Sequence, residues 1–564
     1  MKTLRNLLTL LTLCSWLSLW AQSFSNPVIP GFHPDPSVCR VGDDFYAVNS
    51  SFNYFPGVPI FHSKDLVHWE QIGNVLDRPS QLPLDGANSW LGIYAPTIRY
   101  YKGVYYMITT NVGNGGNFMV KANHPRGPWS EPIWLEQQGI DPSLYFENDK
   151  CYMVSNPDGV IMLCEIDSES GKQLSPSRPL WKGTGGRYPE GPHIYKKDGY
   201  YYLLISEGGT ELAHQLTIAR SKDIYGPYEG CPYNPILTNC NAKGENMQIQ
   251  GTGHGDFVQD QYGKWWVMFL AYRNFGGSYH HLGRETCLAP VEWDEWPVVN
   301  GGNPIDTVMT VAHAPLFSSM PVGGKVSGYD ASVSSDFKEK SLNDLGVSFV
   351  RLQNPIENHY KIGNGRLRLI GHGTLTENKQ PTYLGVRQCA ANMVMETTIS
   401  LKSIREQGKQ PANKNLRAGL SIYQIHDGHM DFYTDGKSVN VSCRLKSLLA
   451  PCNHPGVDSR IPSDARQLKL RVTSDGLMYY FYYALDQGKY TEVARQNCSL
   501  MSTEVAGGFT GVTMGMYVDG KGYADFTSFN YPQIRSESVC SNQFNCYACV
   551  RHQIEANDAL VMPL

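Results

Sequence analysis

Five short runs of aromatic and aliphatic residues recur along the first 270 residues, and each follows a turn. Each run has the length and the aromatic content of a β-strand. From Tyr46 through Tyr106, Tyr152 and Tyr202 to Trp266, the spacings are 60, 46, 50 and 64 residues. The five runs are DFYAV (44–48), VYYMI (104–108), KCYMV (150–154), GYYYLL (199–204) and KWWVM (264–268). A period of about 40–50 residues, lengthened by insertions, predicts a five-bladed β-propeller.

A second element recurs after three of these runs and supports the repeat. Residues 62–65 (HSKD) are followed by Trp69, and residues 220–223 (RSKD) are followed by Gly-Pro-Tyr at 226–228. Residues 127–129 read Gly-Pro-Trp. Since glycine and proline favour turns, we expect these segments to be turns between the outer strands of successive blades.

The second half of the chain has a different pattern of apolar and polar residues. A Gly/Pro-rich stretch at 320–324 separates it from the repeats. Between about 330 and 532, alternating or continuous β patterns such as 366–369, 393–399 and 468–472 lie between turns, and no long helical pattern competes with them. We therefore predict an all-β chain with a propeller at 22–320, an antiparallel β-sandwich at 325–535, and a tail at 536–564 for which the pattern predicts no structure.

The N-terminus has the features of a secretory signal. Lys2 and Arg5 precede a short apolar stretch, and the small residue Ala21 follows it. This order predicts a signal peptide at 1–21 that is removed near Ala21, and hence an exported protein, periplasmic or secreted. A lipid anchor on Cys14 is an alternative. No other stretch has the length and apolarity of a membrane span.

Composition narrows the function classes. The net charge is −4, charged residues make up 18%, and no basic run would follow a phosphate backbone, so no nucleic-acid partner is expected. The 14 cysteines are scattered, and we expect most of them to be buried apolar side chains. Two alternatives stay open: a disulfide between Cys231 and Cys240, and a zinc site at Cys540, Cys546 and Cys549, for which no fourth ligand is obvious.

Three acidic residues occupy equivalent positions in the repeat. Asp35 and Asp141 each lie 11 residues before the aromatic residue of their run, and Glu190 lies 12 residues before its own. In a closed ring of blades, equivalent positions point towards the axis, so the three carboxyl groups should meet. Like charges in one pocket cannot all ionise, which separates a proton donor from an acceptor, as hydrolysis of a glycosidic bond requires. The alternative is that these Asp-Pro and Glu-Gly-Pro sequences only form turns.

Two further residues are candidates for the same site. His254, in Gly-Thr-Gly-His-Gly-Asp, lies 12 residues before Trp266 and so has the same phase in the fifth repeat. Arg284, in Gly-Arg-Glu-Thr, is able to bind a sugar hydroxyl or a carboxylate. The alternatives are a structural histidine and an arginine in a surface ion pair.

Taken in order, the motifs are those of a known family. The chain resembles glycoside hydrolase family 43, in particular its two-domain β-xylosidase and α-L-arabinofuranosidase branch. The resemblance covers about residues 26–530 and is carried by the ordered set of short pieces. These pieces are NPV (26–28), GFHPDPS (31–37), SFNYFPGV (51–58), HSKDLVHW (62–69), YAP (94–96), IDPS (140–143), EGPH (190–193), GHG (253–255) and GRET (283–286).

The resemblance implies a mechanism that inverts the anomeric centre on a five-bladed propeller. By position it assigns Asp35 as the general base that activates water and Glu190 as the general acid that protonates the leaving oxygen. Asp141 becomes the third carboxylate, which raises the pKa of the acid and orients it. In the inverting mechanism, the base and the acid stand far enough apart to admit a water molecule.

The resemblance also implies the residues that bind the sugar. Phe52 matches an aromatic wall, Tyr94 and Ala95 lie in the pocket, and His254 and Arg284 line its floor. Tyr94 stands where xylosidases commonly have tryptophan. No cofactor is required, although relatives often hold a calcium ion or water in the channel near the histidine, and a Ca²⁺ there would be mostly water-ligated.

The second domain resembles the concanavalin-like sandwich of this branch, on residues 381–388, 475–483 and 507–511. In relatives one of its loops narrows the pocket, which favours removal of a single terminal sugar. The leading hypothesis is an exo-acting α-L-arabinofuranosidase acting on plant hemicellulose side chains and oligosaccharides. The alternatives are a β-D-xylosidase and a non-catalytic carbohydrate-binding propeller, and the presence of all three carboxylates argues against the latter.

Overall fold

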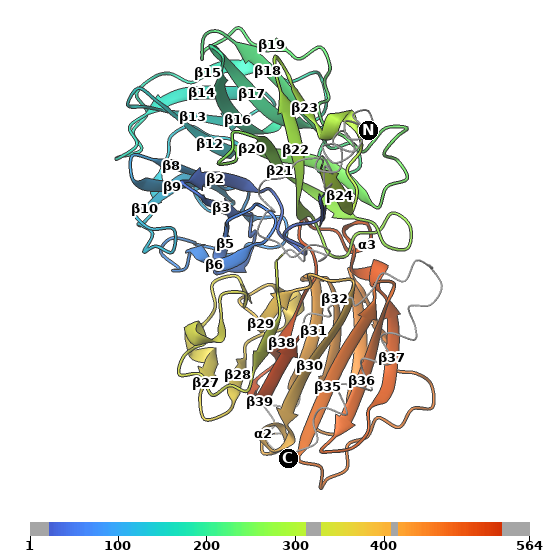
Figure 1. The fold of residues 1–564 in the computed structure, drawn as a ribbon. Coiled ribbons are helices and arrows are strands. Elements are labelled where there is room, and N and C mark those ends of the chain that lie inside the picture. Colours follow the sequence, from blue (N-terminus) through green and yellow to red (C-terminus); the bar gives the residue numbers. More distant parts are fainter. Residues whose placement is uncertain (1–21, 312–328, 408–414, 533–564) are drawn as a thin grey trace, which may run out of the picture.

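The computed structural model describes residues 22–311, 329–407 and 415–532. These residues form two all-β domains, one from the blue and green part of the chain and one from the yellow to red part (Figure 1). The predicted signal peptide, the Gly/Pro-rich boundary at 320–324 and the tail with Cys540, Cys546 and Cys549 lie outside the described residues. No helix in the described part of the chain is long and apolar enough to cross a membrane.

The first domain is a propeller of five antiparallel sheets, as the repeat predicts. The five predicted runs lie at the second position of these sheets, counted from the axis: β3, β9, β13, β17 and β21. In the second blade β7 and β8 share the first position, since both pair with β9. In chain order the sheets are β2 (Ser37–Val41), β3 (Asp44–Val48), β5 (Gly57–Ser63), β6 (Glu70–Leu76); β7 (Gly92–Ile93), β8 (Thr97–Tyr101), β9 (Val104–Val112), β10 (Gly116–Ala122), β11 (Ile133–Trp134); β12 (Ile140–Glu147), β13 (Lys150–Asn156), β14 (Ile161–Ile166), β15 (Arg178–Trp181); β16 (Glu190–Lys197), β17 (Tyr200–Glu207), β18 (Gln215–Ser221), β19 (Glu229–Gly230); and β20 (Ile249–Gln259), β21 (Trp265–Arg273), β22 (Glu285–Trp293), β23 (Pro297–Val299).

The first long strands of the five sheets form a closed ring around the axis. β2 contacts β8 and β20, β12 contacts β8 and β16, and β16 contacts β20. A two-stranded ribbon of β1 (Gln22–Ser25) and β24 (Val308–Val311) joins the two ends of the propeller. Residues at equivalent positions of the ring strands therefore face one another across the axis.

Face-to-face stacking of the blades explains the continuous apolar runs. Met107 and Ile108 are adjacent in β9, point to opposite faces of their sheet, and are both fully buried. A strand covered on both faces needs apolar residues at every position rather than at alternate ones. The segments around Trp69, Gly127 and Gly226 lie between the last two strands of their blades, as predicted.

The second domain is a sandwich of two sheets, which confirms the predicted fold class. Leu470 and Phe481 from one sheet and Phe432 and Met516 from the other share its core. One sheet has the order β27 (Tyr360–Ile362), β28 (Leu367–Gly371), β39 (Gly522–Tyr531), β30 (Asn392–Ser400), β35 (Gln467–Asp475), β36 (Met478–Leu485) and β37 (Thr491–Asn497), with β25 (Val333–Ser335) beside β39. The other has β29 (Thr382–Arg387), β38 (Thr513–Asp519), β31 (Arg417–Ile425), β32 (Gly428–Thr434), β33 (Val439–Leu445) and β34 (Leu448–Pro451). Two short helices are α2 (Leu401–Arg405) and α3 (Thr503–Ala506).

The two domains meet through backbone pairing and aromatic packing. β4 (Tyr54–Phe55) of the propeller pairs with β26 (Arg351–Leu352), which leads into the sandwich. A buried cluster at this junction combines residues of both domains: Phe32, Phe52 and Tyr54 with Tyr383, Tyr423 and Tyr517. The junction is thus part of the apolar core of the protein rather than a flexible linker.

The described cysteines are free thiols, and most of them are buried, as expected. Cys231 is buried and Cys240 is exposed, and the two do not form the disulfide that the sequence left open.

Candidate active site

The structure brings the three predicted carboxyl residues to one end of the ring of first strands. Asp35 lies two residues before β2, Asp141 is the second residue of β12, and Glu190 is the first residue of β16. His254 belongs to β20, the equivalent strand of the fifth blade. Asp35, Asp141 and His254 are almost fully buried, whereas Glu190 is partly exposed.

The backbone at these positions departs from regular β-structure. Asp35, Asp141 and His254 have φ values of 52°, 54° and 43°, a left-handed conformation that residues other than glycine rarely adopt. The pairing register also shifts between Ile140 and Ser143 and between Glu190 and His193. Bulges and positive φ re-aim side chains and are concentrated at functional sites. Here they bring the side chains of Asp35 and Asp141 within 4 Å of that of His254, in the order Asp35–His254–Asp141.

Asp35 is held in its ionised form by its neighbours. Arg284 Nη1 lies 3.1 Å from Oδ1, Ser50 Oγ donates to Oδ2 at 2.5 Å, and His254 Nδ1 lies 3.8 Å from Oδ1. Burial alone would raise the pKa of Asp35, but the guanidinium, the imidazole and the hydroxyl together lower it below its ordinary value. A carboxylate that stays ionised is able to accept a proton from water.

Asp141 and Glu190 form a close pair of carboxyl groups. Ligand atoms of Asp141, Glu190 and His254 all lie within 4.8 Å of one another, and the amide of Gly191 donates to Asp141 Oδ2 at 3.1 Å. His214 Nε2 lies 3.4 Å from Glu190 Oε1. Burial raises the pKa of Asp141 to about 7, and the charges of Glu190 and Asp35 raise it too, against the lowering effect of His254 and the Gly191 amide. Asp141 therefore keeps its proton close to neutral pH.

The raised pKa of Asp141 predicts how the stability of the fold depends on pH. The pKa of Asp141 is about 7 in the folded protein and 3.8 in the unfolded chain, so ionisation of this group destabilises the fold as the pH rises from about 4 to 7. Asp141→Asn removes that ionisation and keeps an acceptor for the Gly191 amide. We expect the variant to have a Tm higher than wild type by about 2 °C at pH 8 and by much less at pH 4.5.

Thermal unfolding at the two pH values checks this expectation. Asp158→Asn, at an exposed position of the same blade, is the matched control and should shift Tm equally little at both. An Asp141→Asn variant that is less stable than wild type at pH 8 would contradict the buried, unfavourable charge.

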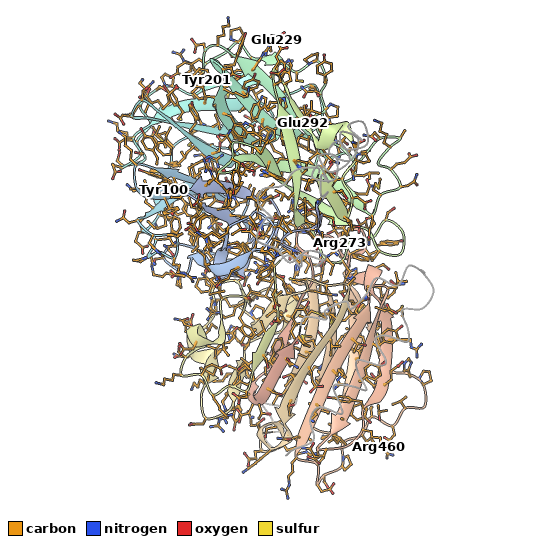
Figure 2. All side chains as sticks on the ribbon, in the orientation of Figure 1. Tyr100, Tyr201, Glu229, Arg273, Glu292 and Arg460 are labelled. Atoms are coloured by element: carbon orange, nitrogen blue, oxygen red, sulfur yellow. The ribbon has the colours of Figure 1, made fainter. Side chains whose placement is uncertain are left out.

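Arg284 belongs to the site and is not in a surface ion pair. Its side chain is buried, and besides Asp35 it donates to Thr210 Oγ1 at 2.9 Å and to the carbonyl oxygen of Phe509 at 3.2 Å. The neighbouring Glu285 is fixed by Arg273 at 2.7 Å, near the end of the propeller that faces the sandwich (Figure 2). Through its carbonyl oxygen, Phe509 of the sandwich thus helps to orient the Arg284 guanidinium beside Asp35.

Aromatic side chains from both domains form one wall of the site. The ring of Phe52 lies 5.1 Å from that of Tyr94 and 6.0 Å from that of Phe509, which in turn lies 4.8 Å from Trp90. Tyr94 Oη donates to the carbonyl oxygen of Trp90 at 2.6 Å, which fixes the tyrosine ring. Ala95 is buried and directly precedes Pro96, as Asp35 and Asp141 precede their own prolines.

The residues do not fit a dedicated calcium site. Among the described residues, only Asp141, Glu190 and His254 form a group of three or more His, Cys, Asp or Glu side chains close enough to share a metal ion. One of its donors is an imidazole nitrogen, whereas Ca²⁺ prefers six to eight oxygen ligands. The Arg284 guanidinium on Asp35 adds a positive charge nearby. A calcium ion near His254 stays an expectation of the family resemblance, and no step below depends on it.

Sequence reasoning missed four residues of the site: Ser50, Thr210, His214 and Phe509. The first three are polar residues with no repeat phase to single them out. Phe509 lies in the Gly-Gly-Phe-Thr-Gly loop at 507–511, whose two glycines at φ 90° and 86° indicate a specialised turn. The paired glycines before Phe509 are visible in the sequence and are the signal that could have identified it.

An ionised carboxylate close to a carboxyl group that keeps its proton is the arrangement that a glycoside hydrolase uses. Comparison with known proteins gives the family. Residues 24–297 match the profile of glycosyl hydrolases family 43, and residues 334–532 match the beta xylosidase C-terminal concanavalin A-like domain. The chain belongs to glycoside hydrolase family 43 and carries its two-domain arrangement.

Full-length relatives are similar in both sequence and structure. A xylosidase/arabinosidase of Butyrivibrio fibrisolvens is 40% identical over 538 residues, covering 90% of this chain and 99% of the relative. The non-reducing end alpha-L-arabinofuranosidase BoGH43B of Bacteroides ovatus is 38% identical over 533 residues, covering 91% and 96%. The solved Bacteroides ovatus xyloglucan PUL GH43B structure superposes with a TM-score of 0.81 at 37% identity, covering 91% of this chain and 100% of that one.

Proposed function

We propose that this enzyme removes single terminal pentoses, preferentially α-L-arabinofuranose, from plant hemicellulose side chains and oligosaccharides, with inversion of configuration. The observation that carries the proposal is the pairing of opposite protonation states in one pocket. Asp35 is held ionised by Arg284, while Asp141, beside Glu190, retains its proton close to neutral pH. The relatives' names, xylosidase/arabinosidase and non-reducing end arabinofuranosidase, support the choice of sugar.

The positions of these residues indicate the role of each one in hydrolysis. Asp35 takes a proton from a water molecule, whose oxygen attacks the anomeric carbon as the glycosidic bond breaks. Glu190 gives its proton to the departing oxygen. Asp141, whose carboxyl group lies beside that of Glu190, orients the acid, while Arg284 keeps Asp35 ionised at rest. His254 lies between the two carboxylates, 3.8 Å from Asp35 and 3.9 Å from Asp141.

The sandwich favours removal of a terminal sugar over cutting within a chain. Phe509 enters the propeller's aromatic wall, and its loop packs closely on the propeller: its amide donates to Ser89 at 3.0 Å. A Cβ on Gly283 would lie 2.6 Å from Gly511 Cα, so the two backbones are in direct contact. We expect this contact to close one side of the site and so to favour removal of a single terminal sugar.

Free sugar released from arabinoxylan and xyloglucan oligosaccharides tests the proposal. We expect arabinose to dominate, and proton NMR should show the inverted anomer first. Xylose in excess would make the enzyme an end-trimming xylosidase. Retained binding without any released sugar would support the carbohydrate-binding alternative.

Tyr94 is the residue through which we propose arabinofuranose is preferred. Its ring contacts Phe52 in the sugar wall, where xylosidases commonly have tryptophan. We expect Tyr94→Trp to shift the ratio of kcat/KM for nitrophenyl arabinofuranoside over nitrophenyl xyloside towards xylose by about tenfold, which corresponds to about 1.4 kcal/mol. Equal ratios in the wild type and the variant would remove this role from Tyr94.

We also propose that the enzyme is exported and acts in the periplasm or outside the cell. Lys2, Arg5, the apolar stretch and Ala21 support this location. N-terminal sequencing of the protein recovered from an extracellular or periplasmic fraction, with a new terminus near residue 22, is the corresponding test.

A further inference from the structure

The segment between β15 and β16, residues 182–189, lies directly before the acid residue Glu190 and is called the rim loop here. It carries Tyr188, whose side chain is 62% exposed although it is a large aromatic residue. Tyr188 also has φ 52°, a left-handed conformation that is a rare and costly one for a bulky residue. Strain of this kind persists where the surrounding structure enforces it, and it is concentrated at ligand sites.

A buried carboxylate enforces the shape of the rim loop. Glu207, fully buried at the end of β17, accepts hydrogen bonds from the amides of Thr184 and Gly186, both at 2.9 Å, and from the hydroxyl of Thr217 at 2.6 Å. A Cβ on Gly183 would lie 2.4 Å from this carboxylate, so the loop backbone is packed against it. The exposed ring therefore sits on a rigid support.

Neighbouring contacts place the ring next to a segment that contacts the site. A Cβ on Gly209 would meet Tyr188 Cδ2 at 3.4 Å, and the next residue, Thr210, accepts the hydrogen bond from Arg284. The guanidinium of Arg187 lies 5.4 Å from the Tyr188 ring, and Arg187 is itself paired with Glu211 at 2.9 Å. Tyr188 thus lies two residues before Glu190 and next to the segment that carries Thr210, the partner of Arg284.

The chemistry of Glu190 decides which part of the substrate meets this ring. If Glu190 protonates the departing oxygen, its carboxyl group faces the leaving sugar. A residue on the same short loop, outside the pocket, then faces the leaving sugar too. An exposed aromatic face with a hydroxyl at its edge suits a sugar ring, which presents apolar C–H groups on its faces and hydroxyls around its rim.

We propose that Tyr188, supported by Glu207, is the stacking platform for the leaving-group sugar and determines how well the enzyme accepts polymeric or oligomeric substrates. This inference rests on the proposed function of Glu190. It concerns a subsite outside the terminal pentose pocket, so its effect should follow the leaving group and not the sugar released.

The test compares two substrates that share the released pentose. One is a pentosylated xylo-oligosaccharide, whose leaving group is a sugar, and the other is the corresponding pentosyl fluoride, whose leaving group offers nothing to stack. We expect Tyr188→Asn, which suits a left-handed backbone, to lower the ratio of kcat/KM for oligosaccharide over fluoride by about tenfold, mainly through KM. Tyr188→Phe should keep the ratio within about twofold of wild type.

Tyr262→Asn is the matched control, because Tyr262 is 56% exposed in the turn between β20 and β21, far from the rim loop in the chain. An unchanged ratio in Tyr188→Asn overturns the platform. So does an equal loss on both substrates, which would mean a general disturbance of the pocket. A loss confined to kcat on the oligosaccharide, with KM unchanged, also overturns it, because it would mean that the substitution only misplaces Glu190. If the wild type cleaved neither substrate, the proposed function would fail instead, and calorimetry with the same oligosaccharide would decide the platform: about tenfold weaker binding by Tyr188→Asn supports it, and equal binding refutes it.

Discussion

Replacing Asp35 with asparagine is expected to lower kcat/KM by about 10³- to 10⁴-fold on every substrate, whatever its leaving group. Asparagine has nearly the same shape as aspartate but cannot take a proton from water. Attack by water is required for every substrate, so a better leaving group does not bypass the loss. Steady-state kinetics on an oligosaccharide, a nitrophenyl pentoside and a pentosyl fluoride measure the effect.

Asp43→Asn is the matched control for this experiment. Asp43 is exposed in the turn between β2 and β3, in the same blade as Asp35, and its replacement should leave all three rates within about twofold of wild type. Near-normal rates in Asp35→Asn would show that another group acts as the base. Circular dichroism and Tm should confirm that the variant is folded.

Replacing Glu190 with glutamine is expected to have an effect that depends on the leaving group. On natural linkages, whose departing oxygen must be protonated, kcat should fall by about 10³-fold or more. On pentosyl fluorides the loss should be much smaller, because fluoride departs without a strong acid. The slope of log kcat against leaving-group pKa, measured over a series of aryl pentosides, should therefore steepen in the variant.

The pH profile provides an independent reading of the same residue. The acid must be protonated, and ionisation of Asp141, whose pKa burial raises to about 7, places a negative charge beside Glu190, so wild-type kcat/KM should decline as the pH rises through that value. In Glu190→Gln, assayed on a fluoride, this alkaline decline should disappear. Glu229→Gln, on the outermost strand of the same blade, is the control and should keep the wild-type profile (Figure 2). An unchanged alkaline limb in Glu190→Gln would contradict the assignment of the acid.

The fold and the centre of the site could be predicted from the sequence because both follow the repeat. Blades stack on both faces, so their second strands are continuously apolar, and the runs around Tyr106 and Trp266 are visible without an alignment. Asp35 and Asp141 share one phase of that repeat, and symmetry about the axis then brings them together. The spacing of the repeat along the sequence was therefore sufficient to predict that Asp35 and Asp141 lie close together in the fold.

The remaining parts of the site depend on contacts that no local pattern records. Thr210 follows a strand end and meets Arg284 only because neighbouring blades close into a ring. Phe509 reaches the pocket from 225 positions further along the chain than Arg284. The pKa of Asp141 arises from burial and from two other carboxyl groups that belong to different blades. These features depend on tertiary packing, so sequence spacing alone could not give them.

The hydrogen bond from Arg284 to the Phe509 carbonyl has a consequence for how such enzymes can be recombined. The two domains look like exchangeable modules, yet the base's pKa depends on an arginine that a backbone atom of the other domain orients. A chimera of this propeller and the sandwich of a distant relative should fold, but proton transfer to Asp35 should be impaired. Including residues 507–511 of this chain in the chimera should restore it. Directed evolution of sugar preference should accordingly find its improvements as linked pairs of changes, one on each side of this junction.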